Sequence, residues 1–300
     1  MRTSQFSIYR ASTLKRKRRT KDELNQLDEQ IIQVLKEDHP QSVRHIFYRM
    51  TDVRLNQPVE KSEKGYRHIQ DRCVKLRRSG LIPYAWIADM SRQGYFVNTF
   101  IDASDFIMSM AGLYRADLWS DADYRCEVWT ESRSIASVIR SLCNELAVDL
   151  YPCSGFSSLS FAHAAAEQHI SSKDNRPLII YYIGDYDPAG VLIDQSLERE
   201  LRLSLNGYIE MDLRRIAINE NQIEQYDLPR KPRKKNDIRS KQIESTVEAE
   251  AMPAHILRQM LREYIESLLP EGALYATKIA EQSERNGLIA LANRTGGYRA

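Results

Sequence analysis

The sequence lacks any apolar run of the roughly 18 residues that a membrane-spanning helix requires. Its N-terminal region has no apolar stretch of the kind found in secretory signals. The 4 cysteines are scattered and include no Cys-x-x-Cys pair, which argues against a zinc ribbon and against a disulfide framework. These absences predict a cytoplasmic protein in a reducing compartment, without contact with a membrane.

The charge of the chain is nearly balanced, with a formal net charge of +2 over 300 residues. Its distribution is uneven, because residues 15–19 and 230–241 are strongly basic. Residues 1–20 contain many Lys and Arg and no Asp or Glu, so we expect a basic arm there. Local basic patches on a nearly neutral protein suit a polyanion that binds at defined places. The length leaves room for two domains.

Residues 21–120 have the pattern of a small helical domain followed by a bridging segment. Apolar residues recur at steps of three and four, which predicts three helices. These helices begin near Lys21, after Ser42 and at Lys64, and the third ends at Gly80. A short extended segment follows at residues 81–89. Three helices and a small β element are typical of a winged helix-turn-helix domain, whose third helix usually enters the major groove of DNA.

Two groups of basic residues are candidates for binding double-stranded DNA. The third predicted helix carries Arg67, Arg72, Lys75, Arg77 and Arg78 on one face. A later loop carries Arg230, Lys231, Arg233, Lys234 and Lys235. Pro229 and Pro232 disfavour a helix in that loop, which leaves its cations available to a phosphate backbone. The alternative for both groups is a solvated surface without a partner.

Residues 121–270 alternate between predicted strands and helices. The strands span residues 125–131, 148–151, 178–183 and about 209–218. Helices of about a dozen residues separate them, and a further helix covers 254–269. This alternation predicts an α/β domain with a doubly wound, Rossmann-like parallel sheet. The final residues, 271–300, show no informative pattern and are assigned to a tail.

Carboxylates follow two of these strands. Glu131 lies at the end of the first strand, and Asp185 and Asp187 follow the third, before a turn that Gly190 completes. The C-terminal ends of parallel strands are where open α/β sheets bind ligands, and paired carboxylates suit Mg²⁺, with Mn²⁺ as a substitute. The alternative is that one Asp caps a helix and the other is solvated.

Three further glutamates are weaker candidates for the same site. Glu127 precedes Glu131 on its strand and is interpreted as a surface charge held in reserve as a ligand. Glu248 and Glu250, before the last predicted helix, could join a metal shell, although a surface position is the favoured interpretation.

The segment Val43-Arg44-His45-Ile46-Phe47-Tyr48-Arg49 resembles the winged-helix domain of the A subunit of topoisomerase VI and of the related meiotic double-strand-break protein. In that family the last Tyr of the segment is the nucleophile, and Tyr48 is the matching residue. Arg44 matches the Arg that precedes it. Without the resemblance, Tyr48 would be interpreted as a core aromatic residue.

The order of Glu131 followed by Asp185-x-Asp187 is similar to the Toprim domain of the same family. Gly190 matches the glycine after the second Asp, and Gly155 matches a glycine turn after the second strand. Relatives usually continue the Glu with Lys or Gly-Lys, whereas this chain has Ser132 and Arg133. Either Arg133 supplies the positive charge or that contact is absent.

The resemblance implies a Mg²⁺-dependent, DNA-cleaving, topoisomerase-like enzyme associated with the nucleoid. Tyr48 would form a 5′-phosphotyrosyl link while Glu131, Asp185 and Asp187 hold the metal. Family members are homodimers in which the Tyr of one chain meets the metal of the other, and strand passage would need a separate ATPase subunit. The alternatives are a Toprim nuclease in which water attacks, and a winged-helix protein that binds DNA without catalysis.

Overall fold

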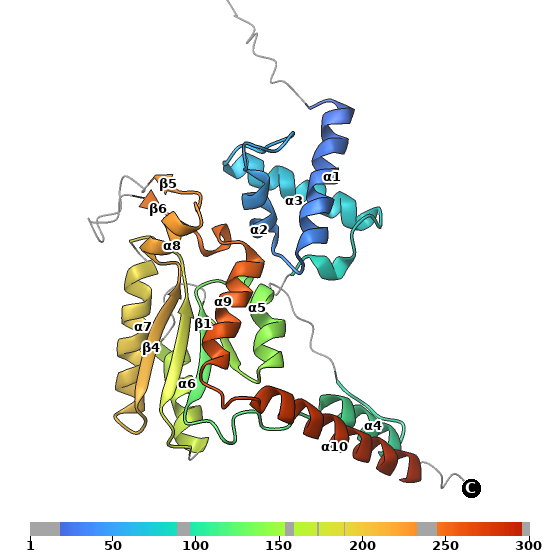
Figure 1. The fold of residues 1–300 in the computed structure, drawn as a ribbon, viewed down its shortest axis with the longest axis vertical. Coiled ribbons are helices and arrows are strands. Elements are labelled where there is room, and N and C mark those ends of the chain that lie inside the picture. Colours follow the sequence, from blue (N-terminus) through green and yellow to red (C-terminus); the bar gives the residue numbers. More distant parts are fainter. Residues whose placement is uncertain are drawn as a thin grey trace, which may run out of the picture.

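The computed structural model describes residues 19–88, 97–153, 159–172, 174–188, 190–232 and 245–295. Three parts can be followed in Figure 1: a unit of three helices, an α/β unit built on a parallel sheet, and a pair of helices that extends away from the sheet. The predicted basic segment 1–18 and Gly155 lie outside the described residues. Among the described helices, none is both long and apolar enough to cross a lipid bilayer.

The first unit contains the three helices that the apolar spacing predicts. They are α1 (Lys21–Glu37), α2 (Val43–Met50) and α3 (Glu63–Arg78). Each begins at a hydroxyl side chain that accepts a hydrogen bond from a backbone N–H of the first turn, at Thr20, Ser42 and Ser62. Their buried faces share one core, which includes Leu27 and Ile46.

The segment after α3 differs from the extended one predicted. Residues Tyr84–Trp86 form a 3-10 turn, η1, in which the Trp86 N–H donates to the Pro83 carbonyl at 3.1 Å. Pro83 has the fixed φ that favours such a turn. Between residues 79 and 88, the β structure is limited to one parallel bridge that joins Gln41 to Ile87. The extended prediction was therefore wrong for this turn.

The second unit is organised around a four-stranded, entirely parallel sheet. Its strands are β1 (Arg125–Thr130), β2 (Asp149–Pro152), β3 (Leu178–Ile183) and β4 (Met211–Ala217), in the order β2-β1-β3-β4. The helices α5 (Arg133–Glu145), α6 (Leu159–Ser172) and α7 (Gly190–Leu205) connect them in turn. The predicted α/β class and parallel sheet are confirmed.

The central strand β3 is buried on both faces, as its apolar sequence predicts. Ile179, Tyr181 and Ile183 pack in the core that contains α5 and α9 (Ala254–Glu266). The alternate residues of β3 pack in a second core, with apolar side chains of α6 and α7. Helices therefore cover both faces of the sheet, which leaves its strand ends as the accessible edges.

The remaining elements lie around these two units. Helix α4 (Ala103–Leu113) packs along α10 (Ala273–Thr295), away from the sheet (Figure 1). The shorter elements are α8 (Glu220–Gln225), β5 (Lys231–Pro232), β6 (Ser245–Thr246) and η2 (Ala249–Ala251). Most of the segment assigned to a tail is thus a long helix, whose weak amphipathic pattern gave no signal in the sequence.

The three-helix unit contacts the α/β unit through α2 and the connection before it. Helix α2 packs against η2, and Arg258 of α9 donates to the Pro40 carbonyl at 3.0 Å. The same guanidinium forms an ion pair with Asp38. These contacts hold α2, with Tyr48 and Arg44, beside the carboxyl edge of the sheet.

Candidate active site

The strand order creates a switch point between β1 and β3. From β1 the chain passes to β2 on one side, whereas from β3 it passes to β4 on the other. Ligands of open α/β sheets bind outside the carboxyl ends of the strands at such a point. Glu131 follows β1 and donates its N–H to the Ile183 carbonyl at 2.9 Å. The Asp185 N–H donates to Glu131 Oε2 at 2.9 Å, so the structure brings these two predicted residues together.

Two glycines let the backbone approach these carboxylates closely. A Cβ atom on Gly184 would lie 3.0 Å from Glu131 Oε2 and 2.6 Å from Cε1 of Tyr182. A Cβ atom on Gly190 would lie 2.2 Å from the Asp185 carbonyl oxygen. A side chain at Gly190 would therefore require the backbone to move, which agrees with the turn predicted there, whereas a side chain at Gly184 would require the Tyr182 ring and the Glu131 carboxylate to shift.

Asp187 lies at the start of α7. Its Oδ1 accepts a hydrogen bond from the Gly190 N–H at 2.6 Å. This contact is the helix-capping arrangement that the sequence left open as an alternative. The hydrogen bond uses only Oδ1 of Asp187, so this residue could cap the helix and also contribute to binding a cation.

The carboxylates Glu131, Asp185 and Asp187 at the switch point are half-buried near one another. Burial raises the pKa of Glu131, and the nearby Asp187 and Glu250 raise it further. Burial and the charges of Glu131 and Glu250 raise the pKa of Asp185 well above its usual range. Such crowding disfavours the ionised forms, and a bound divalent cation would relieve it.

Glu250 is a member of this cluster that the sequence interpretation placed on the surface. Glu250 is only 5% exposed, and Ser132 Oγ donates a hydrogen bond to Glu250 Oε1 at 3.1 Å. The neighbouring Ala249 N–H donates to Asp185 Oδ1 at 2.8 Å. Val247 also pairs with Tyr186 through backbone hydrogen bonds. The segment 247–250 thus runs beside the switch point, and the surface interpretation of Glu248 and Glu250 was wrong.

The donor set has the chemistry that Mg²⁺ requires. Glu131, Asp185 and Asp187 offer hard carboxylate oxygens, and one oxygen of each accepts a backbone hydrogen bond that orients the group. In the described part of the chain, no three His, Cys, Asp or Glu side chains already stand close enough to hold one ion. Binding would therefore draw these carboxylates closer together.

Tyr48 lies on α2 and is 6% exposed. The charge of Glu248 acts on its hydroxyl. The ammonium groups of Lys61 and Lys231 stand 5.6 and 5.5 Å from the centre of its ring. Burial, followed by the charge of Glu248, raises the pKa of Tyr48 above its usual value. In this arrangement the phenol is protonated and shielded from solvent.

Glu248 connects Tyr48 to Arg44. Arg44 Nη1 lies 2.5 Å from Glu248 Oε2, and Lys231 Nζ forms an ion pair with Glu248 Oε1. Burial alone would raise the pKa of Glu248, but hydrogen bonds from Lys231 and Arg44 lower it below its usual value. Glu248 is therefore an ionised carboxylate held between two cations.

A single cavity of about 590 Å³ joins the two units. Arg44 and Tyr66 line it from the helical unit. Arg133, Asp185 and Glu248 line it from the α/β unit. Arg133 is exposed at this position. Of the residues that the sequence assigned to catalysis, Arg44 and Asp185 thus line one opening, whereas Tyr48, Glu131 and Asp187 are not among its lining residues.

The basic residues of α3 divide into two groups. Arg67, Lys75 and Arg78 are exposed. Arg72 instead forms an ion pair with Asp28, and its side chain is 14% exposed. Arg77 donates to the carbonyl oxygens of Tyr84 and Ile87. The last two therefore have contacts within the fold that hold α3 in place.

The predicted basic loop is described only in part. Arg230 is exposed and lies 3.9 Å from Glu224, and Lys231 contacts Glu248 as given above. Arg233, Lys234 and Lys235 lie outside the described residues.

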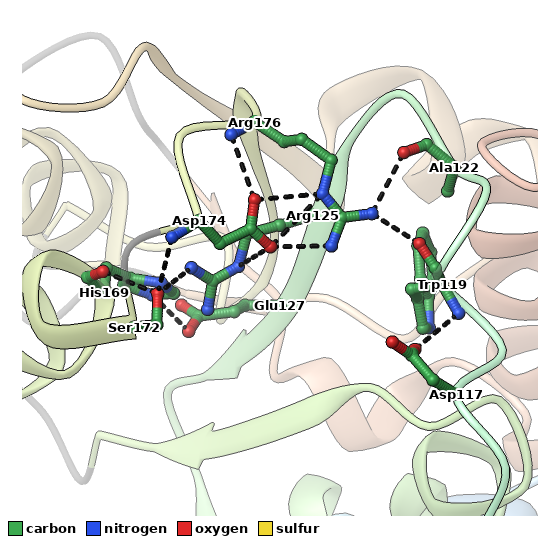
Figure 2. Close-up of polar contacts among 9 residues, drawn as sticks. All are labelled: Asp117, Trp119, Ala122, Arg125, Glu127, His169, Ser172, Asp174 and Arg176. Carbon is green, nitrogen blue, oxygen red and sulfur yellow. Dashed lines mark hydrogen bonds and ion pairs between the residues drawn. The ribbon is translucent and has the colours of Figure 1, made fainter.

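Glu127 does not belong to the carboxylate cluster. It is 2% exposed, His169 Nε2 lies 2.7 Å from its Oε1, and Trp129 Nε1 donates to its Oε2 at 2.7 Å. Figure 2 shows Glu127 and His169 beside Arg125 and Asp174, near the start of β1. Both carboxylate oxygens are engaged there, so its interpretation as a surface charge, and as a reserve ligand, was wrong.

Comparisons with protein-family models, with curated proteins and with solved structures found no match to this chain.

Proposed function

We propose that this protein binds duplex DNA and cleaves its backbone in a Mg²⁺-dependent reaction like that of topoisomerase VI A subunits. In this proposal the three-helix unit is a winged-helix domain and the α/β unit is a Toprim domain. The observation that supports it best is the shared cavity, which brings Arg44, beside Tyr48 on α2, to the carboxylates at the switch point. A tyrosine, cations and clustered carboxylates are the groups that phosphoryl transfer to a phenol requires.

In the proposed reaction the Tyr48 oxygen attacks the phosphorus of a backbone phosphodiester. The bond from phosphorus to the 3′-oxygen of the preceding nucleotide breaks, which leaves a 5′-phosphotyrosyl link and a free 3′-hydroxyl. The phenol loses its proton, and the leaving oxygen gains one. Arg44 would bind a non-bridging oxygen of the phosphate. Glu131, Asp185 and Asp187 would hold a divalent cation, Mg²⁺ or Mn²⁺, which supplies positive charge beside the phosphate when bound.

The exposed cations Arg67, Lys75 and Arg78 on α3 would contact the DNA backbone or groove. The burial of Tyr48 within its own chain supports a conformational change before cleavage. Formation of a homodimer would provide this change if each Tyr48 left its position in its own chain and acted at the carboxylates of the partner chain. Strand passage would further require a separate ATPase subunit.

The burial of Tyr48 also favours a second candidate, a nuclease of the Toprim type in which water attacks the phosphate. The two are separated by incubating supercoiled plasmid with the wild type, Tyr48→Phe and Asp185→Ala in Mg²⁺ or Mn²⁺, and probing DNA 5′ ends for covalently attached protein. Tyr208→Phe is the matched control, because Tyr208 is exposed outside the site. We expect cleavage and an adduct with the wild type and the control, and neither with the other two variants.

Cleavage by Tyr48→Phe without an adduct would favour water as the nucleophile. DNA binding without cleavage by any of the proteins, unaffected by Asp185→Ala, would instead indicate a binding protein with no catalytic role.

A further inference from the structure

The carboxylate of Glu248 occupies a site built for an anion. Arg44 approaches one of its oxygens at 2.5 Å, Lys231 forms an ion pair with the other, and the Lys231 ammonium group also stands 5.5 Å from the centre of the Tyr48 ring. Arg44 and Tyr48 belong to the three-helix unit, whereas Glu248 and Lys231 belong to the α/β unit. This carboxylate is therefore one of the places where the two units meet.

Lys61 adds a cation that the proposed reaction does not yet use. Its ammonium group stands over the Tyr48 ring and donates to the Arg230 carbonyl at 2.8 Å. Burial and the neighbouring Lys231 lower the pKa of Lys61 to about 8, although the charge of Glu248 opposes this shift. Lys61 is thus near enough to this site for the charges of both Lys231 and Glu248 to act on it.

A phosphodiester resembles the carboxylate of Glu248 in its charge and in its hydrogen-bonding oxygen atoms. Both groups have two oxygen atoms that share one negative charge, and both accept charge-assisted hydrogen bonds from Arg and Lys. A phosphate bound between Arg44 and Lys231 would place its phosphorus beside the Tyr48 hydroxyl, which is the arrangement that the attack requires. Glu248 and such a phosphate could not occupy this position together.

We propose that Arg44, Lys61 and Lys231 form a binding site for one DNA phosphodiester beside Tyr48, and that Glu248 fills this site in the free protein as an internal substitute for the phosphate. The identification of DNA as the ligand rests on the function proposed above. Displacement of Glu248 exchanges the carboxylate beside Tyr48 for the phosphate that Tyr48 would attack, with the same three cations around it. The displaced segment also carries Ala249, whose N–H donates to Asp185. Displacement of Glu248 by phosphate would therefore also alter the position of Asp185 in the carboxylate cluster.

The inference is tested by measuring the binding of a fluorescent DNA duplex in EDTA, where no metal-dependent cleavage can occur. The proteins are the wild type, Glu248→Gln and Glu271→Gln, an exposed control that makes the same change in net charge. Glu248→Gln keeps the shape of the side chain but removes the competing charge. We expect it to bind DNA about tenfold more tightly than the wild type, with a salt dependence steeper by about one phosphate contact. Glu271→Gln should bind like the wild type.

Lys61→Gln in the wild-type background provides a second test that does not alter Glu248. It should weaken DNA binding severalfold and reduce the salt dependence by about one contact. Circular dichroism and thermal melting establish that each variant is folded. Equal or weaker binding by folded Glu248→Gln, or unchanged binding by Lys61→Gln, would overturn the inference, as would the absence of DNA binding by all of the proteins.

The same experiment distinguishes this inference from the proposed function. If Glu248→Gln binds more tightly but no protein cleaves plasmid in Mg²⁺, the phosphate site stands and the cleavage proposal fails. If the wild type cleaves through Tyr48 while Glu248→Gln loses cleavage without a gain in binding, Glu248 assists the reaction and does not substitute for phosphate.

Discussion

Gly190→Ala should disrupt the switch point specifically. The new Cβ atom would lie 2.2 Å from the Asp185 carbonyl oxygen, whereas non-bonded contacts settle near 3.5 Å, so the backbone would have to move by about 1 Å. That carbonyl accepts a hydrogen bond from Arg215 at 2.6 Å, which the movement would weaken. Overpacking of this kind costs about 1–3 kcal/mol, and a hydrogen bond to a charged group contributes about 1.5–3 kcal/mol, so with partial loss of that bond we expect a destabilisation of about 2–5 kcal/mol.

Urea denaturation followed by tryptophan fluorescence measures this change, because Trp129 is buried in the sheet. The control is Gly287→Ala on α10, where an added Cβ meets no atom within 4 Å. This control should be neutral or more stable than the wild type by up to about 1 kcal/mol, because alanine favours a helix. Titration with Mg²⁺ should stabilise the wild type and stabilise Gly190→Ala less. Equal stability of the two alanine variants would refute the close approach at Gly190.

Two other predictions concern the helices that carry the site. Burial, with a contribution from Arg258, lowers the pKa of His45 to about 3. The unfolded chain therefore binds this proton near pH 6.5 while the folded chain does not, so stability falls as the pH falls through that range, by about 2 kcal/mol from pH 7 to pH 5. Urea denaturation at both pH values should show this loss reduced in His45→Gln, and an identical loss in that variant would contradict the assignment. Arg72→Met should destabilise the fold by about 2 kcal/mol because it leaves Asp28 partly buried without its partner. Arg78→Met should leave the unfolding midpoint unchanged but weaken DNA binding, and the reverse pattern would show that Arg72 is the DNA contact.

The sequence alone predicted the local elements of this fold well. The helices of the first unit follow from apolar spacing and from hydroxyl residues at their starts, which act within one turn. Strand β3 follows from its short, continuous apolar run of β-favouring residues, which is typical of a strand buried on both faces. The positions of Glu131 and Asp185 at strand ends follow from the same local patterns. Helix α10 was not predicted because its apolar residues do not form one clear stripe.

The environment of the charged residues depended on the tertiary structure. Glu127 has the alternating position of a surface residue, but the fold brings it to His169, which is 42 residues away in sequence. The acidic segment around Glu250 looked exposed, yet it runs beside Asp185 with its apolar residues turned into the core. A local pattern can indicate that a residue is charged, but it cannot indicate which distant group neutralises that charge.

The sequence determined that carboxylates would stand at the ends of parallel strands and that Tyr48 would lie on a short helix with Arg44. Only the tertiary structure decided that β1 and β3 are neighbours, which joins Glu131 to Asp185 across 54 residues. It also decided that Glu248 reaches back to Arg44. Strand order and the docking of the two units depend on packing between distant segments, and that packing leaves no periodic trace in the sequence.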